Sequence, residues 1–307
     1  MTLALSGFTV GVTADRRWQE QAEMLRRRGA EVIHGPAIRT VPLAADDGVR
    51  AATEYLVARP PDLVIAHTGL GMRSWLALAD CHGLGDRLIE ALAGAEVLAR
   101  GPKAAGAALA AGLEVVWRAQ TETLAEVIAH VLERPSLGGL RIALQCDGGD
   151  VDDGVEALRA AGAEVVEVPV YRWYAPEDAR PVERLIEATV AGRIDALTFT
   201  SRPALRNFLA AAEAAGHDDE LRSALAGGVA TVCIGPVCAA SARAEGIAAP
   251  VVPARARLGS LVACLAEHLA GRARTVDVGG VRVELRGTGV VVGGERVELS
   301  EREGLVL

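Results

Sequence analysis

Four short segments each place a polar or cationic residue where an apolar run gives way to a helical pattern. They are HTG (67–69), RGPK (100–103), TSRP (200–203) and GPVC (235–238). The first N–H groups of a helix have no partner within the helix, and they lie at the positive end of its dipole. Helix starts of this kind bind carboxylates, so the spacing predicts sites for an acidic ligand.

The candidate binding residues lie at these helix starts, together with one arginine that follows the first predicted strand: Thr68, Gly101, Lys103, Ser201, Arg202, Gly235, Cys238 and Arg16. Lys103 is the only lysine of the chain. A cation in the first turn of a helix opposes the helix dipole, which favours an anionic partner there.

Each candidate also has a simpler interpretation. Thr68 and Ser201 are typical helix N-caps. Lys103 and Arg16 are residue types that usually lie solvated on a surface. Cys238 is most simply explained as a buried thiol.

No metal site is predicted. His67 has no second histidine or carboxylate at ligand spacing. Aspartates surround Gly148-Gly149 at positions 147, 150, 152 and 153, but their spacing differs from that of an EF-hand loop. The five cysteines are widely spaced and odd in number, which favours reduced thiols over disulfides or structural zinc.

Internal repetition organises the chain. Three segments recur at an offset of 133 or 134 residues: 25–39 in 158–172, 67–79 in 200–212, and 100–115 in 234–249. A constant offset indicates a duplicated unit rather than chance similarity between alanine-rich helices.

Short apolar or β-branched runs alternate with helical patterns through both copies. The runs predict strands at 8–13, 31–34, 63–67, 96–99, 141–145, 164–170, 195–200 and 229–234. Alternation of this kind predicts an α/β protein with parallel sheets flanked by helices, whose ligands bind at the carboxyl ends of the strands. Segments 36–43 and 168–176 are extended and proline-bounded, as expected for paired crossovers between two lobes.

The last part of the chain differs in character. Residues 274–299 form short alternating runs with Gly-Gly turns, which predicts a small β segment. Ser300 to Glu303 is a capping-box pattern that predicts the start of a helix.

Composition excludes several classes of protein. Of 307 residues, 50% are hydrophobic and 23% are charged, which is globular rather than disordered. No apolar stretch reaches the ~18 residues that a membrane-spanning helix needs. The net charge of −8 argues against nucleic-acid binding through the overall field of the chain. The N-terminus lacks the pattern of a signal peptide, which favours the cytoplasm.

Five motifs, taken in their order and offset, resemble those of uroporphyrinogen-III synthases. They are the strand ends HTGLGM and FTSRPAL, the helix starts GPKAA and GPVCA, and the segment VPVYR. The resemblance covers about residues 8–270. It implies two HemD-like lobes, one from 1–36 plus 174–271 and the other from 37–173, joined by a two-stranded crossover. Residues 272–307 resemble the incomplete start of a response-regulator-type winged-helix domain, without the recognition helix that reads DNA.

The resemblance implies that the chain cyclises hydroxymethylbilane, a linear tetrapyrrole with eight carboxylates, with loss of water and inversion of the last pyrrole. No metal or organic cofactor is implied. Tyr171 matches the tyrosine of the family's VYR motif, and this implies that it protonates or orients the leaving hydroxyl. The alternative for Tyr171 is a structural crossover tyrosine.

Three features favour an alternative function, a synthase-like regulator that binds a tetrapyrrole and whose full form carries a DNA-binding winged helix. Ala104 and Cys238 stand where the family commonly has threonine. Aspartates at 147–153 would repel an octacarboxylate. The third feature is the winged-helix-like tail. A periplasmic-type binder of small solutes is disfavoured, since no signal peptide is recognised.

Overall fold

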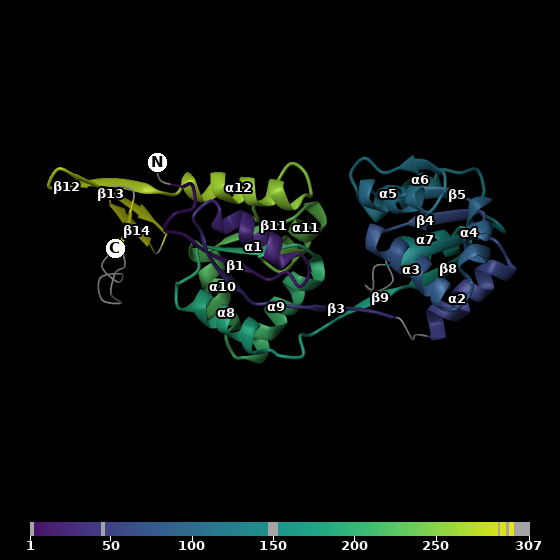
Figure 1. The fold of residues 1–307 in the computed structure, drawn as a ribbon, viewed down its shortest axis with the longest axis horizontal. Coiled ribbons are helices and arrows are strands. Elements are labelled where there is room, and N and C mark those ends of the chain that lie inside the picture. Colours follow the sequence, from purple (N-terminus) through teal and green to yellow (C-terminus); the bar gives the residue numbers. More distant parts are fainter. Residues whose placement is uncertain (1–2, 44–46, 147–152, 288, 293–294, 298–307) are drawn as a thin grey trace. The chain divides into compact units, whose positions relative to one another are not determined.

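The computed structural model describes residues 3–43, 47–146, 153–287, 289–292 and 295–297. Its chain divides into two compact units (Figure 1). Unit 1 comprises Met1–Arg39 and Tyr174–Leu307, and unit 2 comprises Thr40–Trp173. The predicted α/β fold, with two parallel sheets flanked by helices and a two-stranded crossover, is confirmed. The helix predicted from Ser300 and the aspartates at 147, 150 and 152 lie outside the described residues.

Unit 1 is built on a four-stranded parallel sheet of order β11-β10-β1-β2. Its strands are β1 (Thr9–Val12), β2 (Glu31–His34), β10 (Ala196–Phe199) and β11 (Ala230–Cys233). Its helices are α1 (Trp18–Arg26), α8 (Arg180–Val190), α9 (Arg202–Ala214), α10 (Asp218–Gly227), α11 (Pro236–Ala244) and α12 (Leu258–Ala270). Helices α1 and α12 cover one face, where Val10, Val12 and Val232 pack against Leu25 and Leu265.

Unit 2 has a five-stranded parallel sheet of order β6-β5-β4-β7-β8. Its strands are β4 (Leu63–Ala66), β5 (Glu96–Ala99), β6 (Val115–Arg118), β7 (Arg141–Cys146) and β8 (Glu164–Pro169). Its helices are α2 (Asp47–Ala58), α3 (Gly69–Cys81), α4 (Gly85–Ala93), α5 (Pro102–Ala110), α6 (Leu124–Leu132) and α7 (Asp153–Ala160). Strand β6 lies at the sheet edge, where its residues alternate between half-buried and exposed. It was not among the predicted strands, although Val115, Val116 and Trp117 are residue types that favour strands.

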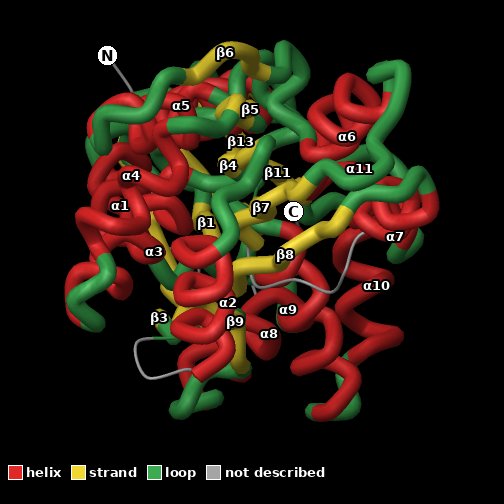
Figure 2. The backbone as a smooth tube through the Cα atoms, turned by 90° about the vertical axis from the view of Figure 1, so that its right-hand side faces the viewer, coloured by secondary structure: helices red, strands yellow, loops and turns green. Residues whose placement is uncertain are grey.

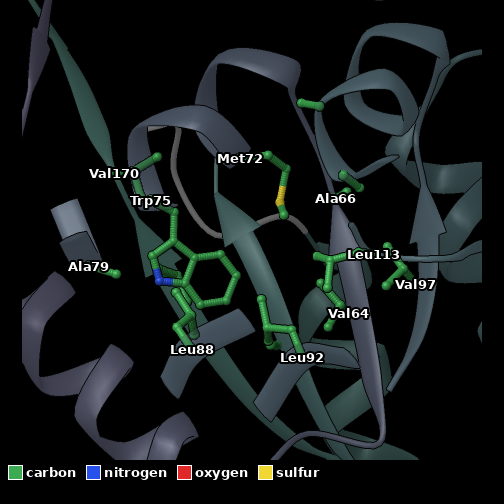
Figure 3. Close-up of a cluster of buried hydrophobic side chains, with 14 of the residues drawn as sticks. Val64, Ala66, Met72, Trp75, Ala79, Leu88, Leu92, Val97, Leu113 and Val170 are labelled. Carbon is green, nitrogen blue, oxygen red and sulfur yellow. The ribbon is translucent and has the colours of Figure 1, made fainter. Parts of the chain in front are cut away.

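Alternate residues of the unit 2 strands serve two separate cores, as expected for a sheet that is covered on both faces. Val64 and Val97 face α2 to α5, whereas Leu63 and Ile65 face α6 and α7. Figure 2 shows these strands between the two helical layers. In the larger core the fully buried Trp75 lies among leucines, methionine and valines (Figure 3).

The chain leaves unit 1 through β3 (Arg39–Pro42) and returns through β9 (Tyr171–Tyr174). These two strands pair with each other in a sheet of their own. The backbone N–H of Leu43 donates to the carbonyl oxygen of Val170 at 3.0 Å. The segments that the sequence predicted as paired crossovers therefore form the two-stranded ladder.

Residues 274–297 form an antiparallel sheet of order β12-β13-β14-β15. Its strands are β12 (Arg274–Val278), β13 (Val281–Arg286), β14 (Gly289–Val292) and β15 (Glu295–Val297). Gly279 and Gly280 both have positive φ, which the two-residue turn between β12 and β13 requires. The sheet is attached to unit 1 through Arg286, whose guanidinium donates to the carbonyl oxygens of Leu3 at 3.1 Å and Ser6 at 3.4 Å.

Candidate functional site

The candidate site of unit 2 lies between β4 and β7, two neighbouring strands whose following helices pack on opposite faces of the sheet. After β4 the chain passes into α3 on one face, and after β7 it passes into α7 on the other face. Parallel sheets bind ligands in the crevice that this reversal opens at the carboxyl ends of the strands. Thr68 follows β4 and Gln145 is the penultimate residue of β7, so both lie at this point.

Thr68 begins α3. Its backbone is extended, and its hydroxyl oxygen accepts a hydrogen bond from the N–H of Gly71 at 2.9 Å. The N-cap interpretation of Thr68 is therefore confirmed. The same hydroxyl oxygen lies 3.3 Å from the phenol oxygen of Tyr171, so the capping residue also contacts the candidate acid.

Tyr171 is the first residue of β9, and its side chain is only 4% exposed. Its ring packs into the larger core of unit 2, edge-on to Trp173 with the ring centroids 5.8 Å apart. The structural interpretation of this tyrosine and its contact with Thr68 coexist, because the ring is buried while the phenol oxygen reaches the end of β4.

Gln145 was missed by sequence analysis. Its amide oxygen accepts a hydrogen bond from the backbone N–H of Thr68 at 2.9 Å, and its amide nitrogen donates to the carbonyl oxygen of Cys146. The side chain is fully buried. The available signal was a polar residue at the end of the apolar run RIALQ, in a strand that is otherwise buried.

Helix α5 begins at the same edge of the sheet. Gly101 is its extended N-cap and makes no side-chain cap hydrogen bond, and Pro102 occupies the first turn, where its missing N–H costs nothing. A Cβ on Gly69 would overlap the carbonyl group of Lys103, so the starts of α3 and α5 lie close together. The Lys103 side chain is exposed. Two positive helix ends and one cation therefore gather at this edge.

Unit 1 repeats part of this arrangement. The hydroxyl of Ser201 caps α9 by accepting from the N–H of Ala204 at 3.2 Å, which confirms its N-cap interpretation. Gly235 is the extended N-cap of α11, with Pro236 in the first turn. Arg202 and Arg16 are both exposed, Arg202 in the first turn of α9 and Arg16 in the loop between β1 and α1.

Cys238 lies in α11 and is 3% exposed. Its sulfur is 3.8 Å from the carbonyl oxygen of Phe199. A hydrogen bond with Cys233 and burial both raise the pKa of the Cys238 thiol. These contacts fit the buried-thiol interpretation, and they point the sulfur inward.

Within the described part of the chain, no cluster of three or more His, Cys, Asp or Glu residues is placed to hold a metal ion. Among the same residues, no helix is long and apolar enough to cross a membrane.

The fold and these paired helix starts define a class of α/β protein, in which two duplicated parallel-sheet units are linked by a two-stranded ladder. Residues 19–263 match the family described as uroporphyrinogen-III synthase HemD. The chain belongs to this family.

Three known proteins are similar to this chain. A mutant uroporphyrinogen III synthase from the extremely thermophilic bacterium Thermus thermophilus is 28% identical, with a TM-score of 0.68 and coverage of 86% of this chain and 99% of that one. A putative uroporphyrinogen-III synthase from Methanothermobacter thermautotrophicus is 34% identical over 36% of this chain and 42% of that protein. The uncharacterized protein YjjA of Bacillus subtilis is 25% identical over 87% of this chain and 98% of that protein.

Proposed function

We propose that this chain is a uroporphyrinogen-III synthase. It converts hydroxymethylbilane into the cyclic tetrapyrrole in which the last pyrrole is inverted, with loss of one water. The family membership and the synthase relatives support this reaction. The contact between Thr68 and Tyr171 at the switch point of unit 2 is the observation that carries it, because it places a phenol among the helix starts that suit carboxylates.

Carboxylates of the substrate suit the helix starts found in each unit. Unit 2 by itself offers the backbone N–H groups and positive dipole ends of α3 and α5, and unit 1 by itself offers those of α9 and α11. The exposed cations at or near these starts are Lys103, Arg202 and Arg16. Cys238 contributes through the backbone of its helix rather than its thiol, since the sulfur is turned toward the carbonyl oxygen of Phe199.

Tyr171 acts on the leaving hydroxyl. A neutral phenol donates a hydrogen bond and, as the C–O bond breaks, a proton, so that water departs and a protonated azafulvene remains. Attack by the substituted α carbon of the last pyrrole forms a spiro intermediate, and that carbon then breaks its bond to its original methylene bridge. The freed bridge bonds to the unsubstituted α carbon of the same pyrrole, and the proton lost from that carbon on rearomatisation restores the phenol. The protein's main contribution is positioning the chain and keeping water from the azafulvene.

Product analysis tests this proposal. Hydroxymethylbilane is generated in place, incubated with the protein, oxidised, and resolved into type I and type III uroporphyrin. Type III above the protein-free control is the expected result. Type I alone, from protein whose circular dichroism shows it to be folded, would overturn the proposal.

The role of Tyr171 is tested separately with Tyr171→Phe. We expect type III formation to fall about a hundredfold, the usual contribution of a general acid. Tyr174→Phe is the matched control, because Tyr174 ends the same strand but is 42% exposed, and it should keep wild-type activity. Unchanged turnover in Tyr171→Phe would remove the acid role while leaving the synthase proposal standing.

A tetrapyrrole-binding regulator is the second candidate. The observation that favours it is the antiparallel sheet β12 to β15, whose Arg286 donates to the carbonyl oxygen of Leu3 within unit 1. We interpret this sheet as the leading sheet of a response-regulator-type winged-helix domain. Saturable quenching of tryptophan fluorescence by a linear tetrapyrrole, with type I as the sole product, would support the regulator over the enzyme.

A further inference from the structure

Gln145 stands out because it is a fully buried amide in a strand whose neighbours Ala143 and Leu144 are apolar core residues. Burying an amide is unfavourable unless its oxygen and nitrogen are hydrogen-bonded. Here the nitrogen donates to the Cys146 carbonyl oxygen and the oxygen accepts from Thr68. An apolar side chain of similar size would fill the same space without needing hydrogen-bond partners. The amide oxygen and nitrogen of Gln145 therefore need a physical explanation.

Gly71 provides the space for this amide. A Cβ at position 71 would overlap the Gln145 side chain, which shows that the amide lies directly against the first turn of α3. Strand β7 and the start of α3 are thereby joined through Thr68, whose N–H and hydroxyl lie 2.9 and 3.4 Å from the same amide oxygen.

Thr68, Gln145 and Tyr171 form one hydrogen-bonding group, in which the Thr68 hydroxyl lies between the other two side chains. The Thr68 hydroxyl oxygen accepts from the Gly71 N–H and carries a single proton. Two oxygens lie within reach of that proton, the Gln145 amide oxygen at 3.4 Å and the Tyr171 phenol oxygen at 3.3 Å. Both contacts are long for hydroxyl hydrogen bonds, as is common at catalytic sites before substrate tightens them.

We propose that Gln145 is a positioning residue for the reaction. Its amide oxygen accepts a hydrogen bond from the Thr68 hydroxyl, which leaves the Thr68 oxygen to accept from the Tyr171 phenol. This contact orients the phenol at the edge of the sheet until the leaving hydroxyl of the substrate replaces Thr68 as the acceptor of the phenol proton. This inference rests on the proposed function, since it gives Gln145 a role through Tyr171.

The proton movements balance. When the Tyr171 proton goes to the leaving hydroxyl, the C–O bond breaks and water leaves. The Thr68 proton then turns from Gln145 to the phenolate, which it stabilises. When ring closure releases a proton, the phenol is restored and the Thr68 proton returns to the amide. Thr68 keeps its own hydroxyl proton throughout and only changes its hydrogen-bond acceptor. Gln145 forms no bond to the substrate.

A double-mutant cycle tests the inference. Gln145→Met keeps the side-chain length and removes the hydrogen bonds, and we expect kcat for type III formation to fall about tenfold with KM unchanged within about twofold. On the Tyr171→Phe background, Gln145→Met should cause no further loss. Gln120→Met, at an exposed glutamine of unit 2, is the matched control and should leave both constants unchanged. Loss by the same factor on both backgrounds, or no loss on either, would overturn the inference.

A second variant tests the same hydrogen bonds from Thr68, and because this hydroxyl also caps α3, the circular dichroism of the variant is compared with that of wild type. Thr68→Val removes the hydroxyl while keeping the side-chain shape and the Gln145 amide. It should reproduce the loss seen with Gln145→Met and likewise add nothing to Tyr171→Phe. Additive losses from Thr68→Val would count against the network.

A spectroscopic arm does not depend on turnover. The chain has three tyrosines, so ring-labelled protein gives three phenol carbon resonances, and Tyr171→Phe identifies one of them. Gln145→Met should shift the Tyr171 resonance and leave those of Tyr55 and Tyr174 in place. Absence of type III product from wild-type protein would overturn the proposed function and the role of Gln145 in that reaction. An unmoved Tyr171 resonance would separately refute the contact of Gln145 with Tyr171 through Thr68.

Discussion

Replacing Gly71 by alanine tests the packing that joins β7 to α3. Gly71 lies in the first turn of α3, and its φ is not in the left-handed region, so alanine meets no backbone strain there. The added Cβ instead overlaps the Gln145 amide, which is fully buried.

The size of the effect follows from three contributions. Alanine stabilises a helix relative to glycine by at most about 1 kcal/mol. Overpacking a closed site costs about 2 kcal/mol. Displacing the amide also removes the hydrogen bond from the Thr68 N–H, which costs about 1 kcal/mol. We therefore expect Gly71→Ala to lower the free energy of unfolding by about 2 kcal/mol.

Gly106→Ala is the matched control. Gly106 lies within α5 of the same unit, and a Cβ there would have nothing within 4 Å. Alanine should therefore raise the free energy of unfolding by about 0.5–1 kcal/mol. Urea unfolding followed by tryptophan fluorescence measures both variants, since three of the four tryptophans belong to unit 2. A Gly71→Ala protein as stable as Gly106→Ala would refute the contact between Gly71 and Gln145.

Three further predictions concern other parts of the structure. Trp75→Phe should lower the free energy of unfolding by about 2 kcal/mol, because it shrinks a fully buried side chain and removes the indole hydrogen bond to Thr53 at 3.0 Å. A loss under about 0.5 kcal/mol in urea unfolding would contradict this expectation. Burial lowers the pKa of His34 from 6.5, so below that pH the unfolded chain binds a proton more readily and stability falls. His34→Gln should flatten this acid slope in melting scans, and an equally steep slope would show that other groups cause it. Hydrogen bonding to a second buried thiol and burial raise the pKa of Cys238, whereas Cys81 is exposed. Ellman's reagent should therefore modify Cys81 in native protein and spare Cys238, and rapid labelling of both would be inconsistent with the buried thiol.

Local patterns in the sequence were enough to predict most of the fold. The run LVIAH became β4 because four consecutive apolar residues suit a strand that is covered on both faces. The N-caps Thr68 and Ser201 act within three residues of their partners, so they needed no tertiary information. The repeat offset indicated that the second half would copy the plan of the first. Strand β6 was not predicted, although its Val-Val-Trp run favours a strand.

The grouping at the switch point depended on tertiary structure. Thr68 is separated from Gln145 by 77 residues and from Tyr171 by 103. Strand order brings them together, because β4 lies between β5 and β7, and the ladder of β3 with β9 sets Tyr171 beside the end of β4. Cys238 shows the opposite case: the sequence placed it at a helix start, and only the packing of α11 showed that its sulfur turns inward.

The sequence by itself therefore determined the duplicated α/β plan, the helix starts and the family, since periodicity, capping and motif order are properties of neighbouring residues. Tertiary structure decided which side chains meet. The polar residue that ends the run RIALQ is a local signal for Gln145, but it does not identify the hydrogen-bond partner Thr68, which is distant in the chain and becomes a neighbour only when the strands assemble.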